Sequence, residues 1–219
     1  MVTYQDINKN AEIRTYIEMA DKTLLAMGYT EHSFAHTERT AKIAHDMLIE
    51  LGYDSRTAEL GRIAGFMHDI GNVVNRQDHA KSGAIMAFHI LSGLGMDPQE
   101  IAIVVSAIGH HDESAAFPVN APAAALILAD KSDVRRSRVR NTELTSFDIH
   151  DRVNYAVIKS WMSIDQADKT VLLDLTVDTE ICSVMDYFEI FLGRMLLCRK
   201  AADFLGMTFK LTVNSTELT

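Results

Sequence analysis

Hydrophobic residues recur every three or four positions along the first part of the chain, which is the period of an amphipathic α-helix. The first such stretch, about residues 10–27, carries Ile13, Ile17 and Leu24 on one face and ends at Gly28, a residue that commonly follows a helix. The same pattern predicts further helices over about residues 33–51, 54–70, 79–91, 97–111 and 122–130. This part of the chain is therefore predicted to be a helical bundle.

The pattern changes after the last of these helices. β-Branched and aromatic residues dominate residues 153–163 and 171–177, with a polar turn between the two runs, which predicts a β-hairpin. A long amphipathic helix over about 179–205 and the strand F-K-L-T-V follow. The sequence thus predicts a mainly α fold, with an all-α domain over residues 1–145 and a small α+β segment over 146–219.

Composition and charge narrow the classes of function. The 219 residues are 47% apolar and 23% charged, so the chain can bury a substantial core. The formal net charge of −9 argues against broad nucleic-acid binding, which needs a basic surface. A small phosphorylated ligand remains compatible with this charge, because a bound metal ion reverses the local sign.

Cysteines and apolar segments indicate the compartment. Cys182 and Cys198 lie 16 residues apart in one predicted helix, too far along its axis to form a disulfide, and are expected to be reduced thiols. The N-terminal residues lack the apolar core of a signal peptide, and no run approaches the roughly 20 apolar residues of a membrane span. We expect a cytoplasmic protein without a membrane partner.

Histidine and aspartate residues form the most distinctive chemical pattern. His68 and Asp69 are adjacent in the segment G-F-M-H-D-I-G-N, among apolar residues where an unpaired charge would be costly. Imidazole and carboxylate groups without a nearby thiolate suit Fe, Mn, Zn, Co or Ni. Further residues of the same types occur along the predicted bundle: His36, His79, His110, His111 and Asp130.

The order H…HD…H…HH…D over about residues 30–140 resembles the HD superfamily of metal-dependent phosphohydrolases. The resemblance implies that His36, His68, Asp69 and Asp130 hold one divalent ion. In the two-metal branch it also implies a second ion, held by Asp69 with His79 and the pair His110 and His111. That branch includes HD-GYP phosphodiesterases and symmetrical diadenosine-tetraphosphate hydrolases. His68 and Asp69 would be the catalytic residues.

The chain departs from this pattern at two places. Many relatives continue H-D-I-G-K, where the lysine helps to hold phosphate, but this chain has the neutral Asn72. The G-Y-P element after the histidine pair is also missing, since only Phe117 and Pro118 stand there. The cyclic-dinucleotide substrate of HD-GYP enzymes is therefore not implied.

Basic residues near the predicted ligands are candidates for binding phosphate. The run R-R-S-R-V-R at 135–140 is either a solvated helix end or a phosphate clamp that includes Arg135 and Arg136. Arg76 and Lys81 flank His79 and are further candidates for the role that Asn72 lacks.

The remaining histidines have simpler interpretations. His32 lies one helical turn before His36 and is an alternative to it as the first ligand. His45 and His89 are interpreted as surface or core residues. His150 lies beyond the predicted helical domain and is interpreted as structural.

These inferences predict a hydrolase that uses two divalent ions to cleave a phosphomonoester or phosphodiester of a small, nucleotide-like molecule. One alternative is an HD protein that binds a nucleotide as a sensor without turnover. Another is a di-iron HD oxygenase, because the same ligands serve that chemistry. The segment 146–219 is expected to cover apolar surface or to form a homodimer contact.

Overall fold

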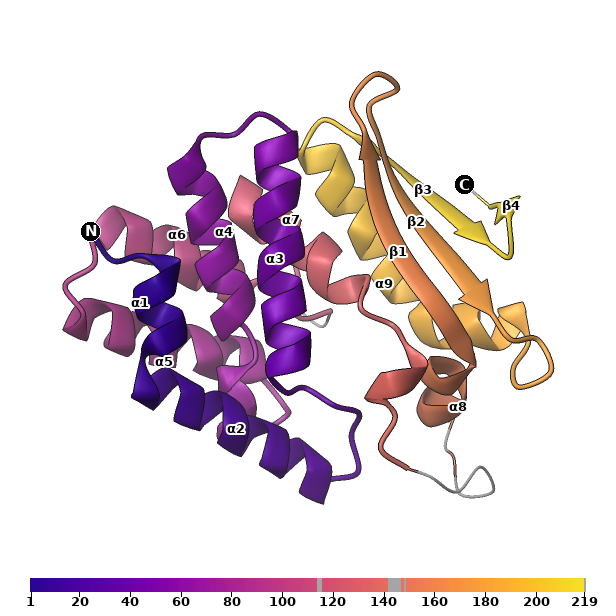
Figure 1. The fold of residues 1–219 in the computed structure, drawn as a ribbon, viewed down its shortest axis with the longest axis horizontal. Helices are drawn as coiled ribbons and strands as arrows, with labels where there is room; N and C mark the ends of the chain where they lie inside the picture. The colour runs from indigo at the N-terminus through magenta and orange to yellow at the C-terminus, as the bar shows by residue number, and fades with distance from the viewer. Residues whose placement is uncertain (114–115, 142–146, 148, 219) are drawn as a thin grey trace.

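The computed structural model describes residues 1–113, 116–141, 147 and 149–218. A helical part lies on one side of the molecule and a small sheet on the other, with α9 behind the sheet (Figure 1). The helical elements of the described chain are α1 (Tyr4–Lys9), α2 (Ala11–Ala26), α3 (Phe34–Glu50), α4 (Ser55–Met67), η1 (Ile70–Val73), α5 (His79–Gly93), α6 (Pro98–Gly109), α7 (Ala121–Lys131), η2 (Arg136–Arg138), α8 (Ile149–Ala156) and α9 (Val184–Phe204).

Helix α3 lies at the centre of the helical part and packs against α4 and α7. The α3–α4 contact is close because Gly65 of α4 has no side chain. A Cβ at this position would lie 2.8 Å from the Cα of Ala41 on α3. Gly71 has a similar role, since a Cβ there would lie 2.0 Å from the carbonyl oxygen of His79. These two glycines bring α3, the end of α4 and the start of α5 together.

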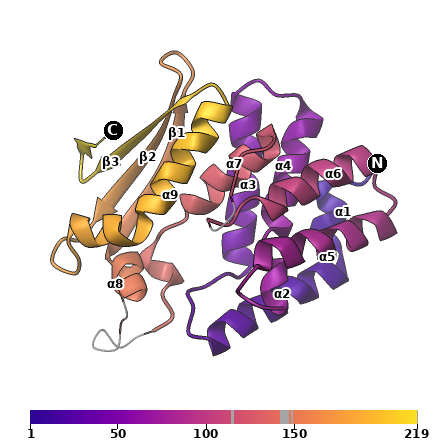
Figure 2. The same ribbon diagram turned by 180° about the vertical axis from the view of Figure 1, so that it is seen from behind.

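The C-terminal part contains a sheet with the strand order β1-β2-β3-β4. The pair β1–β2 is antiparallel, β2–β3 is parallel and β3–β4 is antiparallel. Helix α9 connects β2 to β3 and lies along one face of the sheet, as the view from behind shows (Figure 2). The strands are β1 (Val157–Asp165), β2 (Thr170–Val177), β3 (Thr208–Val213) and β4 (Thr216–Glu217).

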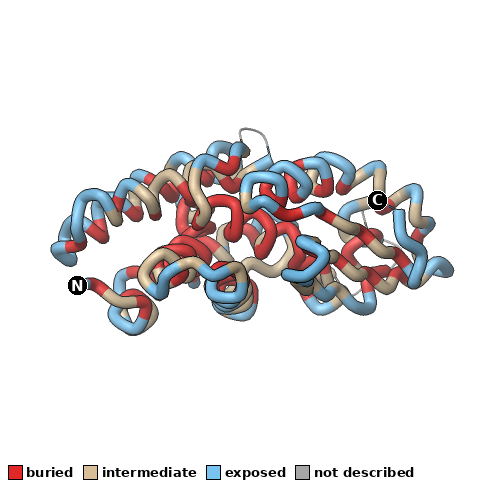
Figure 3. Tube along the Cα trace, turned by 90° about the horizontal axis from the view of Figure 1, so that it is seen from above, coloured by how far each residue is buried: buried red, intermediate tan, exposed pale blue. Residues whose placement is uncertain are grey.

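Buried residues run through the middle of the molecule (Figure 3). One hydrophobic cluster joins α1, α2, α4, α5 and α6. A larger one joins α3, α4 and α7 to α9 and the inner face of the sheet. The division of the chain at residue 145 stays a prediction, and this larger cluster has members on both sides of that position.

The fold class agrees with the sequence: a mainly α protein with a helical domain and a small C-terminal sheet. The chain as a whole is not all-α, because it contains this sheet. One expected element is wrong, since residues 153–156 belong to helix α8 and the strand begins at Val157. Val153 and Ala156 are both buried, and their spacing of three residues fits one helical face.

The helix over residues 54–70 is also shorter than expected, because α4 ends at Met67 and the short helix η1 follows. Helix α1 was not expected at all. Within the described ranges, no helix combines the length and apolar character that crossing a membrane requires.

Candidate metal centre

The structure brings together every predicted metal ligand except His110. They come from five places: the first turn of α3, the end of α4, the first residue of α5, the residue pair after α6, and the last turn of α7. All are buried except Asp130, whose side chain is 13% exposed. The convergent residues are His36, His68, Asp69, His79, His111 and Asp130.

A first cluster consists of four ligand atoms. His36 Nε2 lies 3.3 Å from both His68 Nε2 and Asp130 Oδ1. Asp69 Oδ2 lies 3.2 Å from His68 Nε2 and 3.6 Å from His36 Nε2. Ligand atoms about 2.1 Å from one ion are separated by about 3.0–3.4 Å when adjacent in octahedral or tetrahedral geometry. The distances of 3.2 and 3.3 Å fit a single cation, while those from Asp69 to His36 (3.6 Å) and from Asp130 to His68 (3.7 Å) are slightly longer.

A second cluster lies on the other side of Asp69. His79 Nε2 is 3.2 Å from His111 Nε2 and 3.5 Å from Asp69 Oδ1. The distance from His111 Nε2 to the same oxygen is 4.0 Å. The two oxygens of Asp69 therefore face different clusters.

The orientation of the four imidazoles is fixed at their other ring nitrogen. Three of them donate from Nδ1 to the backbone carbonyl oxygen three residues earlier: His68 to Gly65 (2.8 Å), His79 to Arg76 (3.0 Å) and His111 to Ile108 (2.6 Å). The fourth, His36, donates from Nδ1 to the carboxylate of Asp133 (2.8 Å). A carbonyl oxygen can only accept, so Nδ1 carries the hydrogen. The lone pair of each Nε2 then points into the clusters.

The charges of the centre favour a cation. Burial raises the pKa of Asp69, but the adjacent His68 and other imidazoles hold it well below its usual range. Burial acts likewise on Asp130, and Lys131 and His36 lower its pKa further than burial raises it. Both carboxyl groups are ionised at neutral pH, the form in which they bind metal.

Burial and the neighbouring charges shift the pKa values of the imidazoles in different directions. Burial lowers the pKa of His111 to about 3 and also lowers the pKa of His79. For His68, burial lowers the pKa, but Asp69 and Asp130 outweigh it and raise the pKa above its ordinary value. The first cluster thus carries negative charge that attracts a proton or a cation.

One further atom supports metal binding. Asp69 Oδ2 is buried and accepts no hydrogen bond from the part of the chain that the structure describes. Leaving a buried carboxylate oxygen without a partner is costly. A cation in the first cluster would satisfy this oxygen, so the residues fit a divalent ion.

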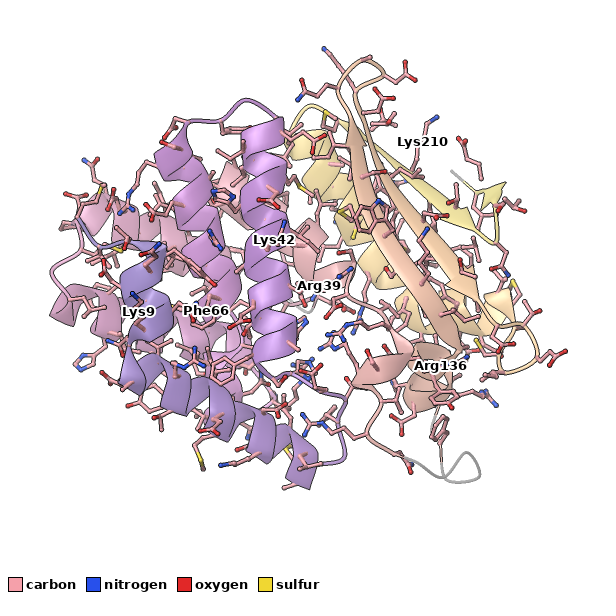
Figure 4. The ribbon with its side chains drawn as sticks, in the orientation of Figure 1. Lys9, Arg39, Lys42, Phe66, Arg136 and Lys210 are labelled. Atoms are coloured by element: carbon pink, nitrogen blue, oxygen red, sulfur yellow. The ribbon has the colours of Figure 1, made fainter. Side chains whose placement is uncertain are left out.

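Asp133 is a residue of the site that sequence reasoning missed. It is buried, and its Oδ2 lies 2.8 Å from Nδ1 of His36. Its Oδ1 lies 2.8 Å from Arg135 Nε and 3.1 Å from Arg39 Nε. Figure 4 shows Arg39 between α3 and the sheet, where it also donates to the carbonyl oxygen of Ser160. Asp133 follows Asp130 by three residues, just beyond the end of α7, and this closeness in sequence could have revealed it.

A cavity of about 170 Å³ opens onto both clusters. One wall is the segment between α2 and α3, which includes Tyr29 and His32. Another is formed by α8 and α9 of the C-terminal part, including Asn154 and Phe191. Four cationic side chains line it: Arg76, Lys131, Arg138 and Arg194.

Other candidate residues lie outside the two clusters. His110 lies next to His111 but is absent from both clusters, and its Nδ1 is buried without a hydrogen-bond partner among the described residues. Lys81 is exposed, with its Nζ 2.8 Å from Asp78 Oδ1. His150 lines the cavity, whereas it was interpreted as structural. His32 also lines the cavity, and its Nδ1 is 2.7 Å from the carbonyl oxygen of Thr30.

The predicted phosphate-binding arginines divide into two groups. Arg76 lines the cavity. Arg135 and Arg136 do not belong to its described lining. Arg136 lies beside α8 (Figure 4), donating from Nε to the carbonyl oxygen of Tyr155 at 2.6 Å. Phosphate binding by Arg135 and Arg136 stays a prediction.

Comparison with known proteins gives one match. The family model described as the HD domain matches residues 33–154, more than half of the chain. This range contains every residue of both clusters and also Asp133. A comparison with curated proteins gives no significant match.

Proposed function

The chain belongs to the HD domain family, and on this premise we propose that it is a phosphohydrolase that uses two divalent ions to cleave a phosphoester of a small, nucleotide-like molecule. Members of this family bind divalent metals and are largely metal-dependent hydrolases. The candidate ligands of this chain fit that activity in both chemical type and arrangement.

The observation that carries the proposal is the pairing of ring nitrogens around Asp69. His36 Nε2 faces His68 Nε2 at 3.3 Å, and His79 Nε2 faces His111 Nε2 at 3.2 Å. Two buried lone pairs at such a distance repel each other unless a positive charge lies between them. Each pair has one oxygen of Asp69 beside it. This arrangement supports one cation for each pair, with Asp69 shared.

The proposed coordination leaves room for chemistry. His36, His68, Asp69 and Asp130 would hold the first ion, and Asp69, His79 and His111 the second. Three or four protein ligands leave positions open for water and substrate, as in catalytic metal sites and unlike closed structural ones. The nitrogen and oxygen donors suit Fe, Mn, Zn, Co or Ni.

The chain's own residues prepare the reaction. Divalent ions, when bound, lower the pKa of water and stabilise negative charge on a phosphoryl oxygen. Asp133 holds the ring of His36 in one orientation through Nδ1. Lys131 Nζ lies 2.6 Å from Asp130 Oδ2 at the cavity wall, where it can also attract a phosphate. Arg76 and Arg194 extend this positive lining.

The size of the cavity limits the substrate. Its volume of about 170 Å³ is more than ten times the roughly 10–15 Å³ that one water needs by the same measure. This space can hold a phosphoryl group together with neighbouring atoms of a small molecule. We therefore propose a small phosphorylated metabolite as the partner of this site.

A metal-dependent phosphatase screen tests the proposal. The purified protein is stripped with a chelator, reloaded with Mn²⁺, Fe²⁺, Co²⁺, Ni²⁺ or Zn²⁺, and assayed for phosphate release from phosphorylated metabolites. We expect release that needs metal and proceeds equally in air and under nitrogen. Turnover that consumes oxygen would favour the oxygenase instead. Binding of a nucleotide by the fully reloaded protein without any phosphate release would favour the sensor.

A further inference from the structure

The two clusters differ in what already contacts their ligand atoms. In the first, Asp69 Oδ2 has no hydrogen-bond donor among the described residues. In the second, Asp69 Oδ1 accepts a hydrogen bond from Asn72 Nδ2 at 2.9 Å. The other contact involves Arg76, whose Nη1 lies 3.4 Å from His79 Nε2. The second position is therefore partly occupied by the chain's own donors.

Asn72 links these two contacts. It is fully buried, and its Nδ2 also lies 3.0 Å from the carbonyl oxygen of Asp69. Its Oδ1 accepts from Arg76 Nη1 at 3.3 Å. A neutral amide at this position can donate to the carboxylate and accept from the guanidinium at the same time. Asn72 thus holds Arg76 in front of His79.

Arg76 is held only weakly in this place. The distances to Asn72 Oδ1 and His79 Nε2 are long for hydrogen bonds. None of the ion pairs found in the described ranges includes Arg76, whereas Arg135, Arg136 and Arg194 each have a carboxylate partner. The ring of Tyr29, 5.6 Å from the guanidinium carbon, offers a second contact on the cavity wall. Arg76 can therefore move when a better partner arrives.

We propose that the guanidinium of Arg76 competes with the second cation for the cluster of His79, His111 and Asp69, and that a phosphate group bound by Arg76 relieves this competition. The inference rests on the proposed function, because it presupposes two cation positions. A guanidinium always carries positive charge and donates to the same Nε2 lone pair that a cation would need. Both cannot occupy that place.

The consequence is cooperative binding of phosphate and the second cation. An anion that draws Arg76 away from His79 frees the lone pair and removes a repelling charge. By linkage, the cation must then raise the affinity for the anion by the same factor. The first cation is unaffected, since Arg76 contacts none of the ligands that belong to the first cluster alone. The second cation would thus bind more tightly when a phosphorylated substrate is present.

Equilibrium dialysis with Mn²⁺ tests the competition directly. Wild type, Arg76→Gln and Arg76→Ala are compared, with Lys81→Ala as a matched control that removes a nearby charge outside the cavity. Circular dichroism verifies that each variant is folded. We expect both Arg76 variants to bind the second equivalent of Mn²⁺ at least about tenfold more tightly, with the first equivalent unchanged. Lys81→Ala should resemble wild type.

Repeating the dialysis with inorganic phosphate tests the coupling. Phosphate should raise the affinity of wild type for the second equivalent of Mn²⁺ and have a much smaller effect on the affinity of Arg76→Gln. A second equivalent that binds equally well in wild type and in both folded Arg76 variants would overturn the inference and leave the two-cation proposal intact. Only one equivalent in every protein at saturating Mn²⁺ would instead contradict the two-cation proposal, and the inference with it.

Discussion

The metal centre and the arginine run at 135–140 are both rich in charge, yet their side chains are satisfied in opposite ways. In the run, each described arginine has an acceptor on another part of the chain, although the buried Nε of Arg140 has no hydrogen-bond partner among the described residues. Arg138 donates to the carbonyl oxygens of Glu31 and Asp133, both at 2.8 Å, and Arg140 pairs with Asp21. In the centre, like lone pairs face one another and a carboxylate oxygen lacks a donor among the described residues.

This difference shows how function and scaffold can be told apart. A charged group whose partners are all supplied by the protein contributes to holding the fold together. Convergent groups of one polarity, buried without such partners, are costly unless a ligand completes them. Asp133 belongs to both regions, because it contacts Arg135 on one side and His36 on the other. The predictions below test this contrast.

The largest effect is expected for Asp69→Ala. This change removes the residue whose two carboxylate oxygens face the two clusters. Both cations should be lost, and phosphatase activity should fall by at least about a thousandfold. Metal analysis and phosphate release measure the two effects. Asp46→Ala, a surface change, is the control, and an Asp69→Ala protein that keeps two equivalents of metal would refute the shared role.

The neighbouring histidines after α6 provide a matched pair. His111→Ala should lose the second cation and lower kcat/KM by about a hundredfold or more, because Nε2 of His111 faces His79. His110→Ala should keep both cations and most of the activity, since His110 is absent from both clusters. Metal content and kinetics of the two variants are compared side by side. Equal losses in both would show that the position of the His111 ring is not what matters.

Asp133→Asn should lower the affinity for the first cation by about ten- to a hundredfold, the usual effect of losing a carboxylate that orients a histidine ligand. The asparagine keeps the volume of the side chain but not its charge. Equilibrium dialysis with Mn²⁺ gives the affinity of each position. The second cation should be unaffected, so equal weakening at both positions would point to a general disturbance of the fold.

The smallest effect is expected in the arginine run. Arg136 is partly exposed and bonded to Tyr155 and Asp178. Arg136→Ala should cost about 1 kcal/mol or less of stability, a Tm lower by about 2–4 °C at most, with kcat/KM unchanged. Thermal unfolding and kinetics check both. A kcat/KM that falls tenfold at full metal content would instead place Arg136 in the phosphate site and break the contrast.

Much of the centre could be predicted from the sequence because its ligands follow a recognisable order. The choice between His110 and His111 could not, since it depends on which ring turns toward His79 at the end of α6. Asp133 could be suspected from its place three residues after Asp130, but its contacts with His36 and Arg39 arise only from the packing of α3. The cavity walls were missed for the same reason.

The C-terminal part shows the same limit for the fold. The hairpin, the long helix and the last strand follow from local patterns. The β-branched and aromatic residues of 153–163 predict a strand from its first residue, although the buried positions Val153 and Ala156 fit a helix. A short segment offers too few positions for the period to decide. The contact of the C-terminal part with the cavity depends on the packing of α9 against α7, which no local sequence pattern encodes.

The most direct test of the account is the number of metal ions bound by the wild-type chain. The purified protein is stripped, saturated with Mn²⁺ in the presence of inorganic phosphate, freed of excess metal and analysed for Mn and protein. The account predicts two equivalents per chain, because two pairs of imidazoles face the two oxygens of Asp69. A single equivalent under these conditions would contradict it.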